Sequence, residues 1–243
     1  METVSDLTGL SVAITGGTSG LGLALVRRLA AGGARIAFVA RSAPAVMRIA
    51  KETGAHGIVG DIRRKDDIYA IALQITGALG GLNVLVNNAS SLGATPLAPL
   101  ADTDCEDFEQ ALVVNVLGAF RLTKALFGAL AAAARNGDTA LVINISSDAS
   151  LNAYPGWGAY GASKAALRQM TAIWAEEAMA DGVRFVSIDP GDMDTPLHAL
   201  AVPDADPSTL KRPEHSAGEI VDAIRMASRA RPSDVRRQAD DCR

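Results

Sequence analysis

Short apolar runs alternate along the chain with longer segments whose apolar residues recur at helical spacing. The short runs are rich in valine, isoleucine and leucine, which is typical of buried strands. They predict six strands, over 10–15, 35–40, 56–61, 82–89, 139–147 and 183–189. The longer segments predict helices, over 21–34, 43–54, 65–80, 102–135, 160–182 and 217–230.

The alternation of strands and helices predicts an α/β fold, a Rossmann-type doubly wound parallel sheet with helices on both faces. Six strands are expected, and a seventh only if the end of the chain supplies it. No linker or repeat interrupts the pattern, so residues 1–243 are expected to form a single domain. Residues 192–215 contain four prolines and are expected to form a loop-like lid, and 231–243 a polar tail.

Composition and charge narrow the class of protein. The chain has 49% hydrophobic and 21% charged residues and a net charge of −4, which argues against a nucleic-acid surface. Cys105 and Cys242 are far apart, and no metal-ligand spacing is visible, so neither a disulfide nor a metal site is expected. No apolar run approaches the ~20 residues of a membrane span. The first residues lack the pattern of a signal peptide, and the expected compartment is the cytoplasm.

A glycine-rich turn, TGGTSGLG, joins the first predicted strand to the first predicted helix. Glycine allows a tight turn and the close approach of a diphosphate, and the start of a helix offers free N–H groups to an anion. The alternative is a plain glycine-rich turn without a ligand. Because the turn follows a strand and opens a helix, we favour a dinucleotide site. Its expected contacts are Gly16, Thr18, Ser19, Gly20, Leu21 and Gly22.

The end of the second predicted strand, FVARS, bears on which dinucleotide binds. An acid at this point would bind the 2′-hydroxyl of the NAD ribose. Ala40 stands there instead, followed by Arg41 and Ser42. Arg41 can pair with a 2′-phosphate through two N–H groups, or it is an ordinary surface arginine. With the acid missing, NADP is predicted and NAD is the less favoured alternative.

Tyr160 and Lys164 lie four residues apart in a predicted helix, so their side chains project from one face. The residues between them are small, which lets a ligand come close to the helix. Taken alone, the pair is as well explained by a surface helix, because Tyr-x-x-x-Lys matches are common. The motifs elsewhere in the chain favour a functional pair.

The ordered set of motifs resembles that of the short-chain dehydrogenases/reductases, over roughly residues 8–230. The motifs are TGGTSGLG, GD at 60–61, NNAS at 87–90, VNVLG at 114–118, ISS at 145–147, YGASK at 160–164 and PGDMDTP at 190–196. The resemblance implies hydride transfer between a nicotinamide cofactor and a carbonyl or alcohol. It also implies further cofactor contacts, namely Asp61 and Ile62 at the adenine, Asn88 along the cofactor, and Pro190, Gly191, Met193 and Thr195 over the nicotinamide.

The resemblance assigns catalytic roles to four side chains. Tyr160 is the expected general acid/base, and a nearby Lys164 ammonium and the oxidised nicotinamide are expected to lower its pKa from the ordinary value of about 10. Lys164 is also expected to hold the nicotinamide ribose. Ser147 is expected to bind the substrate oxygen, and Ser146 to point to the opposite face of the strand. Asn115 is expected to hold a water that links Lys164 to solvent, the alternative being an asparagine that satisfies a backbone group.

Several features depart from the family pattern or stay open. Ser90 takes the usual place of a glycine, and no signature of a seventh strand follows the last helix. We interpret Asp192 and Asp194 as caps of the first turn of the lid. Three further side chains either contact the substrate or are ordinary exposed and packing residues: Tyr154, Trp157 and His198.

The predicted function is an NADP(H)-dependent oxidoreductase that interconverts a ketone or aldehyde and an alcohol. One alternative is a reductase of carrier-bound 3-oxoacyl groups, which would need a basic patch, whereas the lid offers only Lys211 and Arg212. Another is a cofactor-binding regulator without turnover. The resemblance implies a homodimer or homotetramer formed through the helix around 125–134 and the helix of Tyr160. No nucleic-acid or membrane partner is expected.

Overall fold

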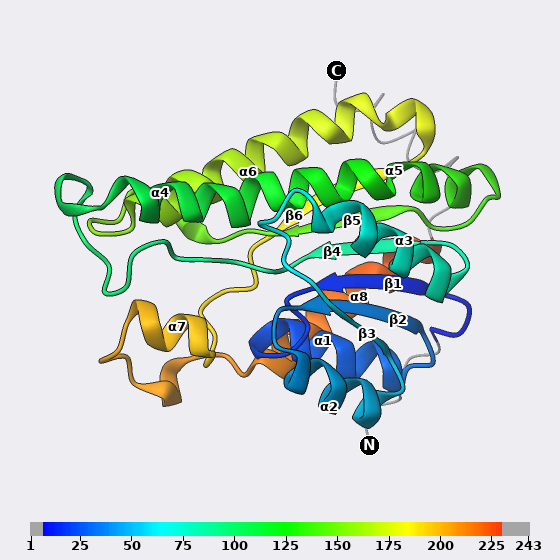
Figure 1. The fold of residues 1–243 in the computed structure, drawn as a ribbon, viewed down its shortest axis with the longest axis horizontal. Helices are drawn as coiled ribbons and strands as arrows, with labels where there is room; N and C mark the ends of the chain where they lie inside the picture. The colour runs from blue at the N-terminus through cyan, green and yellow to red at the C-terminus, as the bar shows by residue number, and fades with distance from the viewer. Residues whose placement is uncertain (1–6, 230–243) are drawn as a thin grey trace.

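In a computed structural model, which describes residues 7–229, six parallel strands form one sheet. The strands are β1 (Ser11–Thr15), β2 (Arg35–Ala40), β3 (His56–Val59), β4 (Val84–Asn87), β5 (Leu141–Ile145) and β6 (Arg184–Ile188). Their order across the sheet is β3-β2-β1-β4-β5-β6 (Figure 1). The direction of winding therefore reverses between β1 and β4, and the predicted doubly wound sheet of six strands is confirmed.

One face of the sheet is covered by α1 (Gly20–Ala31), α2 (Ala43–Thr53) and α8 (Pro213–Arg229). These helices are amphipathic and bury their apolar stripes against the strands. Leu25 of α1, Ile49 of α2 and Ile220 of α8 share one buried cluster with Ile14 of the central strand. This cluster holds the glycine turn and the start of α1 firmly against the sheet.

The other face is covered by α3 (Asp67–Leu79), α4 (Cys105–Leu112), α5 (Ala119–Arg135) and α6 (Gly158–Glu177). Ile71 of α3 and Leu126 of α5 belong to a second buried cluster that includes Leu85 and Val142 of the sheet. Figure 1 shows α4, α5 and α6 as a long helical layer beside the sheet. α6, which carries Tyr160 and Lys164, is thereby fixed next to the end of β5.

The helix predicted over 102–135 is observed as a continuous helix over Cys105–Arg135, with a π-helical segment, Val113–Gly118, between α4 and α5. By length and composition this helix could cross a membrane, with a mean hydropathy of 1.4 in its most apolar window, contrary to the expectation that no such segment exists. Core helices of globular proteins share this property. Leu122, Leu126 and Leu130 are completely buried against the sheet, as in a core helix.

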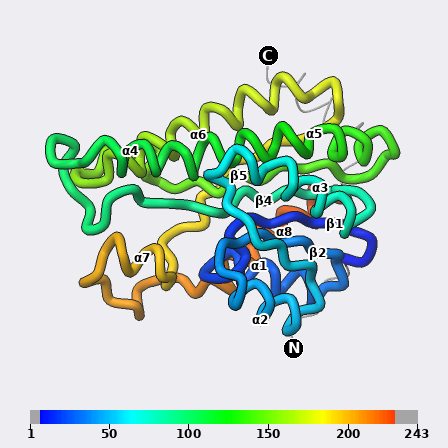
Figure 2. The backbone as a smooth tube through the Cα atoms, viewed as in Figure 1, coloured from blue at the N-terminus to red at the C-terminus, as the bar shows by residue number. Residues whose placement is uncertain are grey.

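The prediction that residues 192–215 form a loop-like lid is wrong in part. A helix, α7 (Pro196–Ala201), forms within it, and α8 begins at Pro213, four residues before the expected start. Thr195 caps α7 by accepting a hydrogen bond from the His198 N–H, and proline is well suited to the first helical position. Figures 1 and 2 show α7 apart from both helical layers.

Asp192 and Asp194 do not cap the lid helix as interpreted from the sequence. Their backbones bond instead to the segment before α8: the Lys211 N–H donates to the Asp192 oxygen, and the Asp194 N–H to the Lys211 oxygen, each over 2.9 Å. These two bonds join the first part of the lid to its last part, just before α8. The polar tail, and with it the question of a seventh strand, lies outside the described residues.

Candidate active site

A cleft of about 1050 Å³ runs along the carboxyl ends of the strands, from the glycine turn to the lid. Parallel strands bring their carboxyl ends to one edge of the sheet, where ligands bind in doubly wound folds. Of the predicted site residues, all line this cleft except Gly22 and Asn115, which lie behind its wall. The structure therefore brings together motifs that are spread over 180 residues of the chain.

The glycine turn is tightly built at the start of α1. Gly16 has a positive φ of 72°, which favours glycine, and its N–H donates to the Val39 oxygen over 2.8 Å. A Cβ at Gly22 would collide with the Gly16 carbonyl oxygen. Asn88 supports the turn from the next strand, because its Nδ2 donates to the Thr15 oxygen over 2.9 Å.

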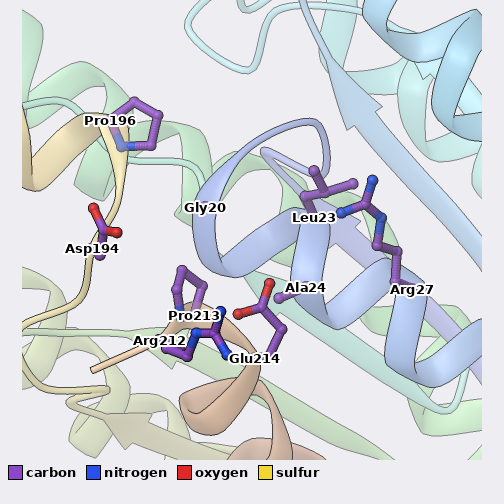
Figure 3. Close-up of a pocket in the computed structure, with 9 residues that line it drawn as sticks. All are labelled: Gly20, Leu23, Ala24, Arg27, Asp194, Pro196, Arg212, Pro213 and Glu214. Atoms are coloured by element: carbon purple, nitrogen blue, oxygen red, sulfur yellow. The ribbon is translucent and has the colours of Figure 1, made fainter. Parts of the chain in front are cut away.

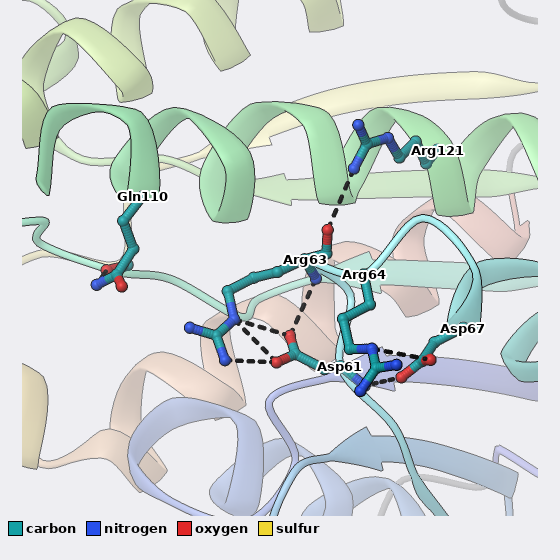
Figure 4. A network of polar contacts seen from close by, with 7 residues as sticks. Asp61, Arg63, Arg64, Asp67, Gln110 and Arg121 are labelled. Atoms are coloured by element: carbon teal, nitrogen blue, oxygen red, sulfur yellow. Dashed lines mark hydrogen bonds and ion pairs between the residues drawn. The ribbon is translucent and has the colours of Figure 1, made fainter. Parts of the chain in front are cut away.

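The part of the cleft beside the ends of β2 and β3, where the adenine is expected, carries two arginines. Arg63 grips the Asp61 carboxylate through Nε and a terminal nitrogen, at 2.8 and 2.6 Å (Figure 4). Burial raises the pKa of Asp61, but the hydrogen bonds from Arg63 outweigh burial and hold this pKa below its ordinary value. Arg41 lines the cleft nearby and makes no hydrogen bond or ion pair to any residue between 7 and 229. Its guanidinium is therefore open to a ligand.

Tyr160, Lys164 and Ser147 meet in the middle of the cleft. Tyr160 and Lys164 project from one face of α6, and the Lys164 Nζ lies 5.4 Å from the centre of the Tyr160 ring. Ser147 follows the end of β5 and is half-buried. Ser146 also lines the cleft, and its hydroxyl is buried without a partner in the described part of the chain; the opposite orientation of Ser146 and Ser147 stays a prediction.

The pKa values of the catalytic pair are set mainly by burial. Burial raises the pKa of Tyr160 to about 12, and although the Ser147 and Ser90 hydroxyls lower it, the charges of nearby aspartates raise it further. Burial also lowers the pKa of Lys164 to about 8. Among the protein groups, the loss of solvent around the phenol therefore dominates its pKa, and Lys164 is not among the groups that lower it. The lowering expected from the ammonium together with the oxidised nicotinamide stays a prediction.

Asn115 lies in the π-helical segment and is almost completely buried. Its side-chain oxygen accepts from the Ser91 N–H and the Ser90 hydroxyl, at 2.8 and 3.1 Å. Its nitrogen donates to the Ser91 oxygen and the Ser163 hydroxyl, both at 2.8 Å. The side chain thus satisfies a backbone group, which was the alternative. These four bonds fill the side-chain amide, so the amide is not the group that would hold the water expected from the resemblance, and that water stays a prediction.

The lid closes the cleft on the side of α1. A Cβ at Gly20 would lie 3.1 Å from the Thr195 methyl group, so lid and glycine turn are in close contact. Behind this contact lies a second cavity of about 280 Å³, lined by charged residues of both signs (Figure 3). Arg27 and Glu214 contribute from α1 and α8, and Asp194 from the lid. None of the predicted catalytic residues lines this second cavity.

Aromatic side chains line the substrate end of the cleft. The Trp157 ring packs edge-on against Tyr160 with a centroid distance of 5.7 Å, and Tyr154 packs against Trp157 at 6.5 Å. His198 and Leu197 of α7 line the same region. Of the two interpretations left open by the sequence, the position of these residues in the wall of the cleft favours contact with a substrate.

A family model described as short chain dehydrogenase matches residues 11–206, which is most of the chain. The chain belongs to the short chain dehydrogenase family. One relative of this dehydrogenase is the 2,5-dichloro-2,5-cyclohexadiene-1,4-diol dehydrogenase of Sphingobium indicum, 33% identical over 80% of this chain and 76% of the relative. Several other curated relatives are longer, and the chain spans 34% to 64% of their length.

Solved structures of short-chain dehydrogenases resemble this one throughout. The 3-ketoacyl-(acyl-carrier-protein) reductase of Brucella melitensis, complexed with NADH, has a TM-score of 0.85 at 27% identity, over 93% of this chain and 95% of its own. A short chain dehydrogenase of Escherichia coli CFT073, complexed with NADPH, has a TM-score of 0.78 at 26% identity, over 87% and 89% of the two chains. The family resemblance seen in the sequence is confirmed.

The cleft of this dehydrogenase fits a nicotinamide dinucleotide. Its volume suffices for a ligand of that size. No side chain caps the start of α1, so its first N–H groups are free to donate hydrogen bonds to an anion. A side chain at position 22 would collide with the Gly16 carbonyl oxygen, so glycine is required there for the tight turn that a diphosphate can approach.

Sequence reasoning missed three residues of the site. Arg63 binds Asp61 and lines the cleft, and Ser91 holds both sides of the Asn115 amide. Asp148 follows Ser147 directly and accepts a hydrogen bond from its hydroxyl over 3.1 Å. Each of the three stands one or two residues from a motif position, and a closer reading of the motif neighbours would have found them.

Proposed function

We propose that the protein is an NADP(H)-dependent oxidoreductase that interconverts a ketone or aldehyde and an alcohol. The observation that carries this proposal is the meeting of Tyr160, Ser147 and Lys164 in the wall of a cleft that begins at an uncapped helix start. When bound there, the nicotinamide supplies or accepts the hydride. The protein groups then have to bind the substrate oxygen and move one proton.

In the direction of reduction, the substrate oxygen accepts hydrogen bonds from the Ser147 hydroxyl and the Tyr160 phenol. As the carbonyl carbon receives the hydride, the Tyr160 proton moves to the oxygen and an alcohol forms. A phenol with a pKa of about 12 is well protonated near neutrality and is poised as an acid toward the alkoxide that develops. In the reverse direction the phenolate takes the alcohol proton, and the positive charges of Lys164 and the oxidised nicotinamide favour that phenolate.

A preference for NADP is supported by the charge at the adenine end. Ala40 leaves no carboxylate at this position to repel a 2′-phosphate. Arg41 makes no hydrogen bond or ion pair among residues 7–229, although its charge acts on Asp61 nearby. Arg63 adds a second guanidinium to the same wall, although its charge is shared with Asp61. The relatives of known structure include one complexed with NADH and one with NADPH, so the family alone does not decide the preference.

A reductase of carrier-bound 3-oxoacyl groups is the second candidate, because the Brucella relative is named for that reaction. Acidic carriers dock on basic surfaces. The substrate end of this cleft carries Asp148, Asp189 and Asp192, and Lys211 is paired with Glu219 at 3.3 Å. This charge pattern favours a free substrate over a carrier-bound one. The third candidate, a regulator without turnover, is disfavoured because Tyr160, Lys164 and Ser147 are all in place.

The test is the oxidation of NADPH and NADH by the purified protein with a panel of ketones, aldehydes and a carrier-bound 3-oxoacyl group. We expect NADPH to be oxidised with free carbonyl substrates. Oxidation that requires the carrier would favour the second candidate. Tight NADPH binding without oxidation by any substrate would favour the third. A homo-oligomeric state and a cytoplasmic location stay predictions, which gel filtration and cell fractionation would check.

A further inference from the structure

Asp148 places a carboxylate one hydrogen bond away from the catalytic centre. It is the first residue of a short 3-10 turn, Asp148–Ser150, directly after the end of β5, and its half-buried side chain lines the substrate end of the cleft. The Tyr154 hydroxyl donates to its Oδ2 over 2.6 Å. The Ser147 hydroxyl donates to its Oδ1 over 3.1 Å. The carboxylate is thus held in one orientation by two side chains that themselves line the cleft.

The carboxylate is ionised near neutrality. The hydrogen bond from Tyr154 lowers the pKa of Asp148 below its ordinary value, and the Ser147 hydroxyl and nearby N–H groups add to this effect against the opposing influence of burial. A charged acceptor forms stronger hydrogen bonds than a neutral one. Asp148 is therefore a strong acceptor at the point where the substituents of a bound substrate would lie.

This arrangement has a consequence for Ser147. A serine hydroxyl has a single proton to donate, and in the bond to Asp148 that proton is directed to the carboxylate, while the oxygen accepts from the Ala149 N–H over 3.2 Å. The Tyr160 hydroxyl is a further hydrogen-bond neighbour of Ser147. A plain ketone has only acceptors near its carbonyl carbon. Its oxygen must therefore compete with a carboxylate for the Ser147 proton, and a neutral carbonyl oxygen is the weaker acceptor.

A hydroxyl group on the carbon next to the carbonyl removes this competition. It can donate to the Asp148 carboxylate in place of Ser147, and the Ser147 proton is then free for the carbonyl oxygen. Resting on the proposed function, we propose that Asp148 is a substrate-binding residue, and that it selects carbonyl compounds with a neighbouring hydroxyl group and the corresponding vicinal diols. The neighbouring hydroxyl keeps its own proton, while the hydride adds to the carbonyl carbon and the Tyr160 proton to its oxygen.

The negative charge of the cleft around Asp148 also favours a neutral hydroxyl-bearing substrate. Asp189 and Asp192 line the cleft near Asp148, so a substrate with a carboxylate next to its carbonyl would meet three negative charges. Lys164 is the nearest cation of the catalytic group, and its ammonium is directed to the Ile145 oxygen over 2.7 Å. Neutral substrates that donate hydrogen bonds fit this end of the cleft, and anionic ones do not.

The test compares 2-hydroxycyclohexanone with cyclohexanone, which share a ring and differ in one hydroxyl. We expect wild-type kcat/KM with NADPH to favour the hydroxyketone at least about tenfold, since a hydrogen bond to a charged acceptor is stronger than one to a neutral acceptor. In Asp148→Ala we expect the ratio to fall close to one, with lower kcat/KM for the hydroxyketone and an equal or higher kcat for cyclohexanone. A merely structural role of Asp148 would lower both. Asp192→Asn, which removes a charge of the cleft but no bond to Ser147, is the matched control and should keep the ratio.

A binding experiment separates this inference from the proposed function. Binding of trans-1,2-cyclohexanediol and of cyclohexanol to the NADP-loaded protein is measured through the fluorescence of Trp157, which packs against Tyr154 and Tyr160. If the diol binds more tightly than cyclohexanol and Asp148→Ala abolishes this difference, the inference is supported. Lack of turnover of both ketones would count against the proposed function alone and would leave this inference standing. Equal binding of diol and cyclohexanol, or a ratio of kcat/KM that Asp148→Ala leaves unchanged, would overturn it.

Discussion

The Lys164 ammonium donates a hydrogen bond to the main-chain oxygen of Ile145 over 2.7 Å, from a position that is 2% exposed to solvent. The bond ties the catalytic helix α6 to the end of β5, beside Ser147. It also sets the distance between the ammonium and the Tyr160 ring. Burial of the Lys164 ammonium disfavours its charged form, which is why the pKa of Lys164 falls to about 8.

The stability of the fold should therefore depend on pH through Lys164. The unfolded chain keeps the lysine proton up to its ordinary pKa of 10.5, whereas the folded chain releases it near 8. The folded state accordingly gains stability as the pH rises between these values, before Tyr160 begins to titrate. Between about pH 7.5 and 9.5 we expect the free energy of unfolding of the wild type to rise by about 1–2 kcal/mol relative to Lys164→Met. Urea unfolding of both proteins at the two pH values measures this, and parallel changes would contradict it.

Arg41 should decide the preference between the two cofactors. If its guanidinium binds the 2′-phosphate, Arg41→Ala removes a charge-assisted bond that only NADPH can form. We expect KM for NADPH to rise about 10–100-fold, with KM for NADH changed less than about threefold. The reverse substitution, Ala40→Asp, should weaken NADPH and favour NADH. Equal effects of Arg41→Ala on both cofactors would show that Arg41 does not contact the phosphate.

Asn115 should contribute chiefly to stability. Asn115→Ala removes four hydrogen bonds, so that the Ser91 N–H and carbonyl lose this partner and the buried Ser163 hydroxyl keeps only its bond to the Tyr160 oxygen. We expect the free energy of unfolding to fall by about 2–4 kcal/mol. Ser90→Gly, which restores the usual family residue and removes one bond, should cost about 1 kcal/mol or less. Thermal and urea unfolding compare the two, and a smaller loss in Asn115→Ala than in Ser90→Gly would count against this network.

Gly22 should be indispensable for the shape of the cofactor turn. Gly22→Ala places a methyl group against the Gly16 carbonyl, so the turn has to open. We expect the Kd for NADPH, measured by fluorescence titration, to rise at least about tenfold. Gly77→Ala is the matched control, because Gly77 lies exposed in α3 with no atom within 4 Å of the new methyl group. It should leave NADPH binding unchanged and add about 0.5–1 kcal/mol of stability.

Much of this architecture could be predicted because it depends on local patterns. Strand and helix positions follow from hydrophobic periodicity, and the placement of Ser147, Tyr160 and Lys164 in one cleft follows from the ordered motifs. The lid helix was missed because Pro196 was taken only as a loop residue, although proline suits a helix start after a Thr195 cap.

What the sequence could not reveal depends on contacts between distant segments. The hydrogen bond between Tyr154 and Asp148 requires the exact path of a loop, and the filled amide of Asn115 requires the position of the NNAS segment. The effect of burial on the pKa of Tyr160 is hidden from the sequence for a related reason. Spacing along a helix shows that an ammonium is near, but it does not show how completely the phenol is removed from water.

The central claim is that Tyr160 transfers the proton in an NADPH-dependent reduction, and Tyr160→Phe tests it most directly, because the ring is kept and only the hydroxyl is lost. kcat for a ketone and Kd for NADPH should be measured on the same preparation. We expect kcat to fall by about 100–10,000-fold while Kd stays within about threefold of the wild type. A variant that binds NADPH normally and still reduces the ketone at a rate close to that of the wild type would contradict the account.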